Sequence, residues 1–515
     1  MKEFCLKYKK SFVVALLFSL VCFGFMLTHF DLSIDEETWI MGGNIVGWLR
    51  QSRYTLWLYD LLFTDNGNYV PFLYDFLGIC LWNIAGIILL YCYFEEHEIN
   101  GIVMFILLAY YDSVPFVLAD IMSFSFYLVQ IGIATIFTSL SVYLTIQFIN
   151  EKKLSYLIIS SLLLWLAFGA YQALICYYVS AFAGYCVLDY IRGNRKKLFK
   201  KIITGVLFCV IGVLGYVVID KIAISIVGSD GYLNDSYIGW KEENPLVEFL
   251  MSIANVGRVS FAVPYQDVTV NGATCIRILT ILFVIYAFYQ TFHIEKKTKE
   301  RITVFLLCVA LSFSPFFLYI AMATYKTVGR MMLGLPVIGI VQIYLISTVL
   351  QTSLQTSLLK KGGFLLSSGL LVINAAQINT AYFQQHITHE KDCELATEIM
   401  HDIQSEGIDY HDKPIVFIGM LEQDTIFDDQ LGELGSSFFS HDEGNIGRMI
   451  SFLRFRGYDV SLPSVEQINN AYQSVKDAEM NPWPYSNSIM ELDDIIVVYL
   501  SEPTDLWFTV NGVQR

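Results

Sequence analysis

The stretch SFVVALLFSLVCFGFMLTHFDLSIDEE, residues 11–37, passes directly from an apolar run into a cluster of carboxylates. The apolar part, 11–29, is long enough to cross the roughly 30 Å of hydrocarbon in a bilayer. We therefore expect the carboxylates to emerge where a first membrane span meets water. The run has no small-x-small cleavage site and is followed by many further apolar runs, so we expect a retained helix and not a cleaved signal peptide.

The bulk composition is that of a membrane protein. Of 515 residues, 55% are hydrophobic and only 16% are charged, and the mean hydropathy is +0.52. A soluble protein has about 25% charged residues. We predict a mainly α-helical, polytopic membrane protein with about 11 transmembrane helices. The predicted spans are 11–29, 71–93, 101–118, 122–149, 154–171, 173–191, 202–221, 273–293, 302–322, 331–350 and 363–381.

Basic residues indicate the orientation of these spans. Clusters of lysine and arginine fall in connections on one side only, at 2–10, 152–153, 192–201, 296–301 and 360–361. The positive-inside rule makes that side the cytoplasm, so we expect a cytoplasmic N-terminus and an extracytoplasmic C-terminus. The long outer connections are acidic and contribute much of the net charge of −15, which gives no reason to expect a nucleic-acid partner.

The composition changes sharply near residue 382. We predict a transmembrane domain over 1–381, with outer loops 30–70 and 222–272, and a small extracytoplasmic α/β domain over 382–515. In the tail, apolar runs at 414–419 and 495–500 have the length of buried strands, and 394–405, 444–457 and 465–478 have helical periodicity. Only one of the ten cysteines, Cys393, lies in this tail, so no disulfide forms there within one chain, which favours a bacterial plasma membrane.

The carboxylates of the first outer loop have two interpretations. Ser33 and Glu36 have the S-x-x-E spacing of a capping box, which predicts a helix that starts at Ser33. Asp31 would then lie just before the cap, and Asp35 and Glu36 would lie in the first turn, where acids stabilise the positive end of a helix. The alternative is catalysis, because a carboxylate within reach of an acceptor hydroxyl can act as a general base. No DxD pair is present, so we predict no metal site and no cofactor, although a divalent ion would accept such oxygen ligands.

Aromatic residues and arginines follow the carboxylates. Trp48 and several other tryptophans and tyrosines are interleaved with Arg50 and Arg53, which is typical of a segment at the outer membrane surface. One interfacial helix with acids at one end and arginines along it could hold a lipid phosphate and an acceptor hydroxyl together. For Arg50 and Arg53, contact with lipid headgroups and binding of a substrate phosphate both remain open.

Charged residues also lie near the outer ends of later spans. Asp112 and Asp120 flank Pro115; we expect Asp112 to be solvated at a span edge, and Asp120 to be either solvated or functional. A helically spaced apolar stripe predicts an amphipathic helix in the second outer loop; its residues are Leu246, Phe249, Leu250, Ile253 and Val256. We expect Arg258 to lie beside this stripe and to snorkel toward water. Arg330 is a basic residue in a short connection on the predicted outer side, where the positive-inside rule disfavours it. It is therefore the arginine that we favour first for binding an anionic ligand.

Several of these motifs resemble those of the bacterial Gtr-type membrane glucosyltransferases, which modify O-antigen and related polysaccharides. The acidic string 33–37 after the first span resembles the acidic cluster of that family. Ser52-Arg53-Tyr54 is similar to its Gly-Arg-aromatic signature, with serine in place of glycine. Tyr171-Gln172, which could otherwise pack a tight turn, looks like its Tyr-Gln signature, and Arg330 looks like its late outer arginine. The resemblance covers roughly residues 10–380.

The resemblance implies a GT-C-like architecture and a sugar donor on polyprenyl phosphate, used at the outer face. It also implies that an acid of the first outer loop is the general base, for which we favour Asp35, then Asp31 and Glu36. The expected substrate-binding residues are Glu37, Arg50, Arg53, Asp120, Tyr171, Gln172, Arg258 and Arg330. The predicted activity is transfer of a hexose from undecaprenyl phosphate to an envelope glycan. Among hexoses, we favour glucose. The alternative is a transporter or flippase of lipid-linked sugars, although no internal repeat supports it.

Overall fold

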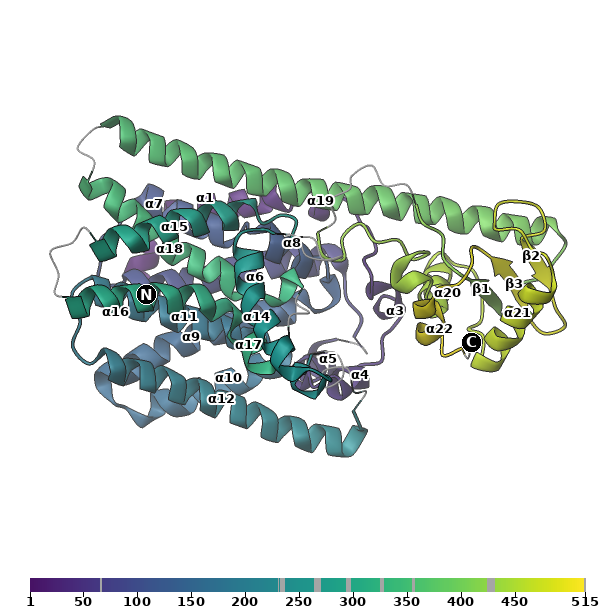
Figure 1. Ribbon diagram of the computed structural model, residues 1–515, viewed down its shortest axis with the longest axis horizontal. Helices are drawn as coiled ribbons and strands as arrows, with labels where there is room; N and C mark the ends of the chain where they lie inside the picture. Colours follow the sequence, from purple (N-terminus) through teal and green to yellow (C-terminus); the bar gives the residue numbers. More distant parts are fainter. Residues whose placement is uncertain are drawn as a thin grey trace. The chain divides into compact units, whose positions relative to one another are not determined.

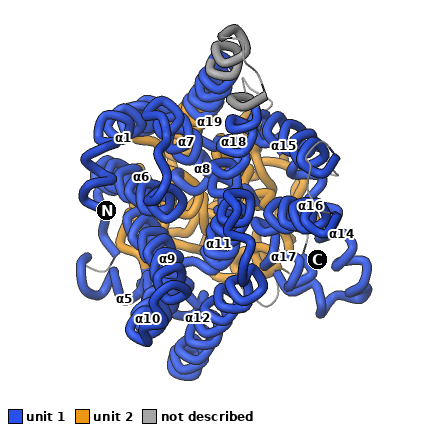
Figure 2. Tube along the Cα trace, turned by 90° about the vertical axis from the view of Figure 1, so that its left-hand side faces the viewer, with its two compact units in different colours: residues 1–28, 44–380 blue, residues 29–43, 381–515 orange. Residues whose placement is uncertain are grey.

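The computed structural model describes residues 1–64, 67–229, 231, 237–263, 270–292, 298–324, 328–353, 357–423 and 431–513. The chain is mainly helical and has one small β-sheet (Figure 1). It divides into two compact units (Figure 2). Unit 1 comprises 1–28 and 44–380, and unit 2 comprises 29–43 and 381–515. We predicted that the whole of 30–70 belongs with the membrane part, whereas 29–43 lies in unit 2. The predicted domain boundary at 381–382 stays a prediction.

Unit 1 is built from helices throughout its described residues. They are α1 (Lys2–Cys22), α2 (Gly24–Thr28), α4 (Val46–Arg50), α5 (Tyr54–Phe63), α6 (Pro71–Phe94), α7 (Gly101–Tyr111), α8 (Pro115–Met122), α9 (Ser125–Glu151), α10 (Leu154–Ala170), α11 (Leu174–Ile191), α12 (Leu198–Val227), η1 (Gly239–Lys241), α14 (Pro245–Ser260), α15 (Thr274–Phe292), α16 (Thr298–Phe313), η2 (Ser314–Phe316), α17 (Phe317–Met322), η3 (Gly329–Met331), α18 (Gly334–Ser353) and the part of α19 (Ser357–Ser405) that precedes residue 381.

Several of these helices can cross a membrane. Within the described part of the chain, 6 helices are long and apolar enough by length and composition, namely α6, α9, α11, α12, α15 and the continuous run α16–α17 over Thr298–Met322. α7 and α8 pass the same test only as a bent pair, and α10 and 334–349 are shorter apolar helices. The chain is therefore compatible with a multi-pass membrane protein, and the count of about 11 spans stays a prediction.

The predicted span 101–118 is not a single helix. α7 ends at Tyr111, and α8 begins at Pro115 after a bend of 57°. Proline at the first position of α8 disfavours helical backbone at Val114, which is extended at φ −78° and ψ 103°. Asp112, expected to be solvated, is instead buried in this break, where its Oδ2 accepts a hydrogen bond from Asn83 at 2.5 Å.

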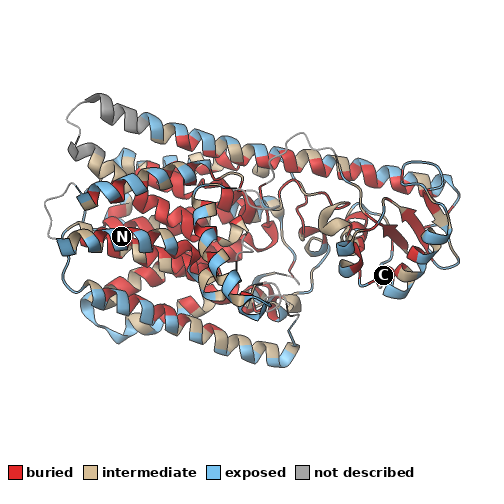
Figure 3. Ribbon diagram, viewed as in Figure 1, coloured by how far each residue is buried: buried red, intermediate tan, exposed pale blue. Residues whose placement is uncertain are grey.

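The interior of unit 1 lies along its central helices. α8 is buried over its whole length, and α7 and α11 are buried over most of theirs (Figure 3). α9 packs against α6 and α10, whereas α12 exposes much of its apolar surface. Exposed apolar side chains along α12 are what a helix at the lipid-facing side of a bundle requires, because lipid is its solvent.

Unit 2 contains a mixed three-stranded sheet with helices around it. Its elements are α3 (Glu36–Trp39), the part of α19 from residue 381, β1 (Ile415–Ile418), η4 (His441–Glu443), α20 (Ile446–Phe455), α21 (Val465–Asp477), β2 (Ile489–Glu491), β3 (Ile496–Tyr499) and α22 (Asp505–Val510). The strand order is β1-β3-β2, with β1 parallel and β2 antiparallel to β3. Both predicted strands form, β3 at the centre of this sheet and β1 at its edge, and both are almost entirely buried.

Residues 29–43 belong to unit 2 because their apolar side chains lie in its hydrophobic core. Leu32 and Ile34 are 0% and 2% exposed and lie in the same hydrophobic core as β1 and β3. Gln385 of α19 donates a hydrogen bond to the Leu32 carbonyl at 2.9 Å and accepts one from the Gly435 backbone at 2.7 Å. The acids at 31 and 35 alternate with these buried residues, so the core of unit 2 fixes the backbone that carries them.

Candidate functional site

The acidic segment of the first loop is a tight turn followed by a short helix. α3 begins at Glu36 and not at Ser33 as predicted, because Asp35 has left-handed backbone at φ 76°. Half of the expected capping box forms: the Glu36 carboxylate accepts a hydrogen bond from the Ser33 backbone N–H at 2.9 Å. Asp is one of the few residues that adopts this conformation without glycine, so the sequence permits the turn that breaks the helix.

The predicted single interfacial helix with both acids and arginines is wrong. Three short helices take its place. α3 lies in unit 2, whereas α4, which ends at Arg50, and α5, which follows Arg53, lie in unit 1. Glycines at 42 and 43 and the bend that follows separate them. The candidate residues therefore fall into two sets, each with its own surroundings.

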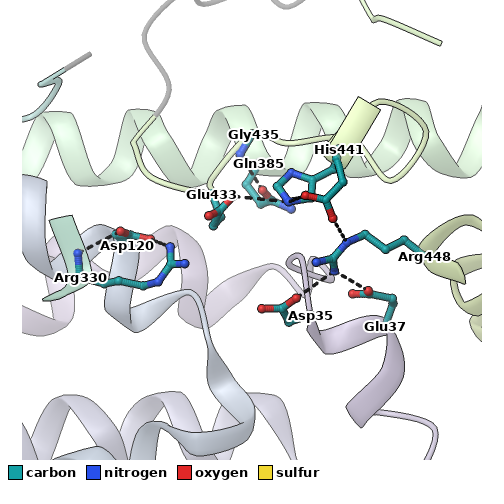
Figure 4. A network of polar contacts seen from close by, with 10 residues as sticks. Asp35, Glu37, Asp120, Arg330, Gln385, Glu433, Gly435, His441 and Arg448 are labelled. Atoms are coloured by element: carbon teal, nitrogen blue, oxygen red, sulfur yellow. Dashed lines mark hydrogen bonds and ion pairs between the residues drawn. The ribbon is translucent and has the colours of Figure 1, made fainter. Parts of the chain in front are cut away.

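The unit 2 set converges on an arginine that the sequence analysis missed. Nη1 of Arg448 lies 2.9 Å from Oδ1 of Asp35 and 2.8 Å from Oε1 of Glu37 (Figure 4). Nε of Arg448 lies 2.9 Å from Oδ2 of Asp442. We call Asp35, Glu37, Asp442 and Arg448 the carboxylate–arginine cluster. It gathers three acids from two segments around one guanidinium.

The four candidate acids differ in access to solvent. The side chain of Asp35 is 47% exposed, whereas that of Glu37 is 1% exposed. Glu36 is buried, and its carboxylate is used by the Ser33 backbone. Asp31 is 9% exposed and lies 2.7 Å from Nδ1 of His386. Asp35 is thus the candidate acid with a carboxylate that a substrate can reach.

Burial also changes the proton affinities of two of these acids. It raises the pKa of Glu37 to about 7, against the opposing charge of Arg448. Burial likewise raises the pKa of Asp31, against its hydrogen bond to His386. A carboxyl that titrates near neutrality inside the carboxylate–arginine cluster makes the stability of unit 2 depend on pH.

We expect this dependence to be visible in thermal unfolding. Because the pKa of Glu37 is higher in the folded chain than its ordinary 4.5, Glu37 stabilises the fold below about pH 4.5, and that contribution is lost as pH rises through about 7. The loss is on the order of 2–3 kcal/mol. The fall in Tm between pH 5 and pH 8 should be smaller in Glu37→Gln than in the wild type. Glu466→Gln, at an exposed position of α21, should match the wild type; an equal fall in Glu37→Gln would contradict the assignment.

The unit 1 set is organised around Arg53. Its guanidinium carbon lies 5.7 Å from the ring centre of Trp48 and 5.7 Å from that of Tyr171. Trp48 is itself fixed, since its indole N–H donates to Asp60 at 2.8 Å. Gln130 donates to the other oxygen of Asp60 at 3.0 Å. Burial raises the pKa of Asp60 to about 6, against these two hydrogen bonds.

Arg53 has no acidic partner within the ranges that the structure describes. Its Nε is buried and makes no hydrogen bond to any of these described residues. Aromatic rings hold a cation without neutralising it, so Arg53 retains its full charge and donors for an anion. This combination distinguishes Arg53 from the paired arginines 330 and 448.

Tyr171 and Gln172 fill the break between α10 and α11. Gln172 donates to the Ser52 carbonyl at 3.0 Å and to the Tyr216 hydroxyl at 2.9 Å. Ser52, directly before Arg53, has left-handed backbone at φ 61°, which explains why glycine suits this position and why serine is strained there. Gln172 therefore fixes the backbone that presents Arg53, and Tyr171 contacts its side chain.

Arg330 is paired with Asp120. Oδ1 of Asp120 lies 3.1 Å from Nη1 of Arg330, and Oδ2 accepts from the Arg330 backbone N–H at 2.9 Å (Figure 4). The guanidinium lies 4.9 Å from the Phe124 ring centre. The Tyr171 hydroxyl donates to the Arg330 carbonyl at 3.5 Å. Contacts thus join Arg53, Tyr171, Arg330 and Asp120 in sequence.

We expect the Asp120–Arg330 pair to contribute to stability. Asp120 is 1% exposed and the Arg330 side chain 16%. Asp120→Asn should lower stability by somewhat less than the about 3–5 kcal/mol of a fully buried pair. Glu300→Gln breaks the more exposed ion pair of Glu300 with Arg195 and should cost about 1 kcal/mol or less. Equal Tm changes for the two variants, measured on the full chain in detergent, would contradict a structural role for the pair.

The remaining predicted binding residues lie elsewhere. Arg50 is exposed at the end of α4. Arg258 is half-buried in the last turn of α14, which forms the predicted amphipathic helix. Among the described residues, no group of three or more His, Cys, Asp or Glu side chains is arranged to hold a metal ion; the absence of a metal requirement stays a prediction.

Sequence reasoning missed the residues that support these candidates. Asp60 is an acid in the otherwise apolar α5, and a buried acid in such a helix is a signal that could have been used. Arg448 carried no comparable signal, since it is 411 positions away from Glu37.

The fold and these contacts define a mainly helical protein with several candidate membrane spans and two polar sets, one centred on Arg53 and one on Arg448. A family model described as glucosyl transferase GtrII matches residues 24–380, which is more than half of the chain. The chain therefore belongs to the GtrII glucosyl transferase family, as the resemblance implied. The match includes both the acidic turn and the Arg53 set, and it ends before Arg448. A search among curated proteins finds no significant match.

Proposed function

We propose that this chain transfers glucose from a polyprenyl phosphate to a polysaccharide of the cell envelope, on the outer face of a bacterial plasma membrane. Membership of the GtrII family implies glucosyltransferase activity. The observation that supports a phosphate-linked donor is Arg53, a cation beside two aromatic rings with a buried Nε that makes no hydrogen bond to a described residue. Such a group suits the phosphate of a membrane-bound donor.

Arg53 is our choice for the phosphate, in place of Arg330. The sequence analysis favoured Arg330, but Asp120 accepts from both its backbone and its guanidinium. An arginine neutralised by a buried carboxylate has less charge to offer a second anion. We assign Arg330 and Asp120 to support of Tyr171, whose ring contacts Arg53.

Asp35 is our choice for the general base. Of the four candidate acids at 31–37 it has the most accessible carboxylate, with a side chain 47% exposed. In the reaction, a bond forms between the acceptor oxygen and the anomeric carbon, and the bond from that carbon to the phosphate oxygen breaks. The phosphate leaves with the electron pair, and the acceptor proton passes to Asp35. Phosphate is a good leaving group, so no general acid is required.

Each assignment rests on contacts inside one unit. Within unit 1, the aromatic rings and Gln172 hold Arg53 in a fixed orientation, which is what stabilisation of a developing phosphate charge requires. Within unit 2, the core residues Leu32 and Ile34 and the contact with Arg448 hold Asp35.

The experiment that tests this function separates transfer from transport. Proteoliposomes containing the full chain, undecaprenyl-phosphate [¹⁴C]glucose and an envelope glycan are sampled for label in the glycan and for label in each leaflet. The proposal expects label to enter the glycan, at a rate that depends on the chain. Movement of lipid-linked label between leaflets, with none in the glycan, would instead favour a flippase.

A further inference from the structure

We infer that Arg448 is a positioning residue for the general base, so that the C-terminal part of the chain takes part in the glucosyl transfer. This inference rests on the proposed function and deepens it. Arg448 lies outside the residues matched by the family model, 24–380. Its contacts with Asp35 and Glu37 nevertheless make it the side chain that fixes the acidic turn (Figure 4).

Arg448 is itself held from two directions. It is the third residue of α20, and the side chain of the N-cap residue Asn445 accepts its backbone N–H at 3.3 Å. Its Nε donates to Asp442, three residues before Asn445, at 2.9 Å. Because Nε is used within its own segment, the remaining end of the planar guanidinium points in a fixed direction. That end carries Nη1, which contacts the acidic turn.

The contact leaves Asp35 available for chemistry. Arg448 lies 2.9 Å from Oδ1, and Oδ2 makes no hydrogen bond or ion pair with another described residue. A carboxylate held by one oxygen, with the other accessible, is oriented for a proton acceptor. The backbone of Asp35 must also be held in place by neighbouring residues, because it has a left-handed conformation that persists only where surrounding contacts stabilise it.

Stability alone does not explain the cluster. Three carboxylates around one guanidinium exceed its charge, and one oxygen of Glu37 is buried with no hydrogen-bond partner in the described part of the chain. An apolar pair would bury the same surface between α3 and α20 without this cost. An exposed acid held by an arginine whose side chain is only 18% exposed is what positioning of the acid requires.

The test is a double-mutant cycle on glucosyl transfer by the full chain in proteoliposomes, with undecaprenyl-phosphate glucose as donor. Arg448→Gln should lower kcat by about 10- to 100-fold, as expected for a misplaced base, and should leave the KM for the donor within about 2-fold. In the Asp35→Asn background, Arg448→Gln should cause no further loss. Arg456→Gln, an exposed residue at the end of the same helix, should match the wild type.

The outcomes are separable. Wild-type kcat in Arg448→Gln, or the same fractional loss in both backgrounds, would overturn the positioning role and leave the proposed function intact. Absence of transfer by the wild type would overturn both. If Arg448→Gln does not reach the membrane, Asp442→Asn removes the acceptor of the Arg448 Nε–H. That variant should give a smaller loss of kcat that again vanishes in the Asp35→Asn background.

Discussion

Replacement of Asp35 by asparagine is expected to lower the rate of glucosyl transfer by about 10²- to 10⁴-fold, the usual contribution of a general base. Asparagine has nearly the same shape but cannot take the acceptor proton. The side chain is 47% exposed, so the change should alter Tm little. The measurement is the initial rate of label transfer, normalised to the amount of chain in the membrane.

The control for Asp35→Asn is another exposed carboxylate of unit 2. Asp409 is paired with His411 at 2.8 Å, and its side chain is 68% exposed. Asp409→Asn should keep the wild-type rate. An unchanged rate in Asp35→Asn would move the base to Asp31, Glu36 or Glu37. Of these three, Glu36 and Glu37 are buried and Asp31 is slightly more exposed.

Replacement of Arg53 by glutamine is expected to lower transfer by about 10²- to 10³-fold, as loss of one preorganised charge-stabilising group does in other active sites. Charge develops on the phosphate as its bond to the sugar breaks, so kcat should fall more than donor affinity. Arg53→Lys keeps the charge but loses the planar contact with Trp48 and Tyr171, and should have an intermediate rate.

The control for Arg53→Gln is an arginine in a different setting. Arg195 pairs with Glu300 at 2.6 Å, in a connection that we predict to be cytoplasmic. Arg195→Gln should transfer glucose at the wild-type rate. Equal rates for Arg53→Gln and the wild type would contradict the phosphate assignment and return Arg330 or Arg258 as the candidate.

Local patterns predicted many helices and strands of this chain. Period and length identified β1, β3, α14 and α21 because their apolar residues repeat as the buried face of each element requires. β2 and α22 were missed because they are short, at 3 and 6 residues. The helix start at Ser33 was wrong because the left-handed backbone of Asp35 overrode a capping signal that forms only in part.

The site was predictable only as a set of residues, not as an arrangement. Motif resemblance identified Arg53, Tyr171, Gln172 and Arg330, and the structure joins all four by contacts within unit 1. No local pattern reports that Asp120 neutralises Arg330, which is 210 positions away, because pairing at that separation depends on the tertiary fold. The contact of Arg448 with the acidic turn has the same cause.

The most direct test of this account is transfer of glucose to envelope glycan by membranes that carry the wild-type chain or Asp35→Asn, with two donors in parallel. Undecaprenyl-phosphate [¹⁴C]glucose and UDP-[¹⁴C]glucose are supplied at equal concentration to membranes freed of other glycosyltransferases. The account predicts transfer from the lipid-linked donor by the wild type, little from the nucleotide donor, and a loss of at least about 10²-fold in Asp35→Asn. Transfer from the nucleotide sugar alone, or none from the lipid-linked donor, would contradict it.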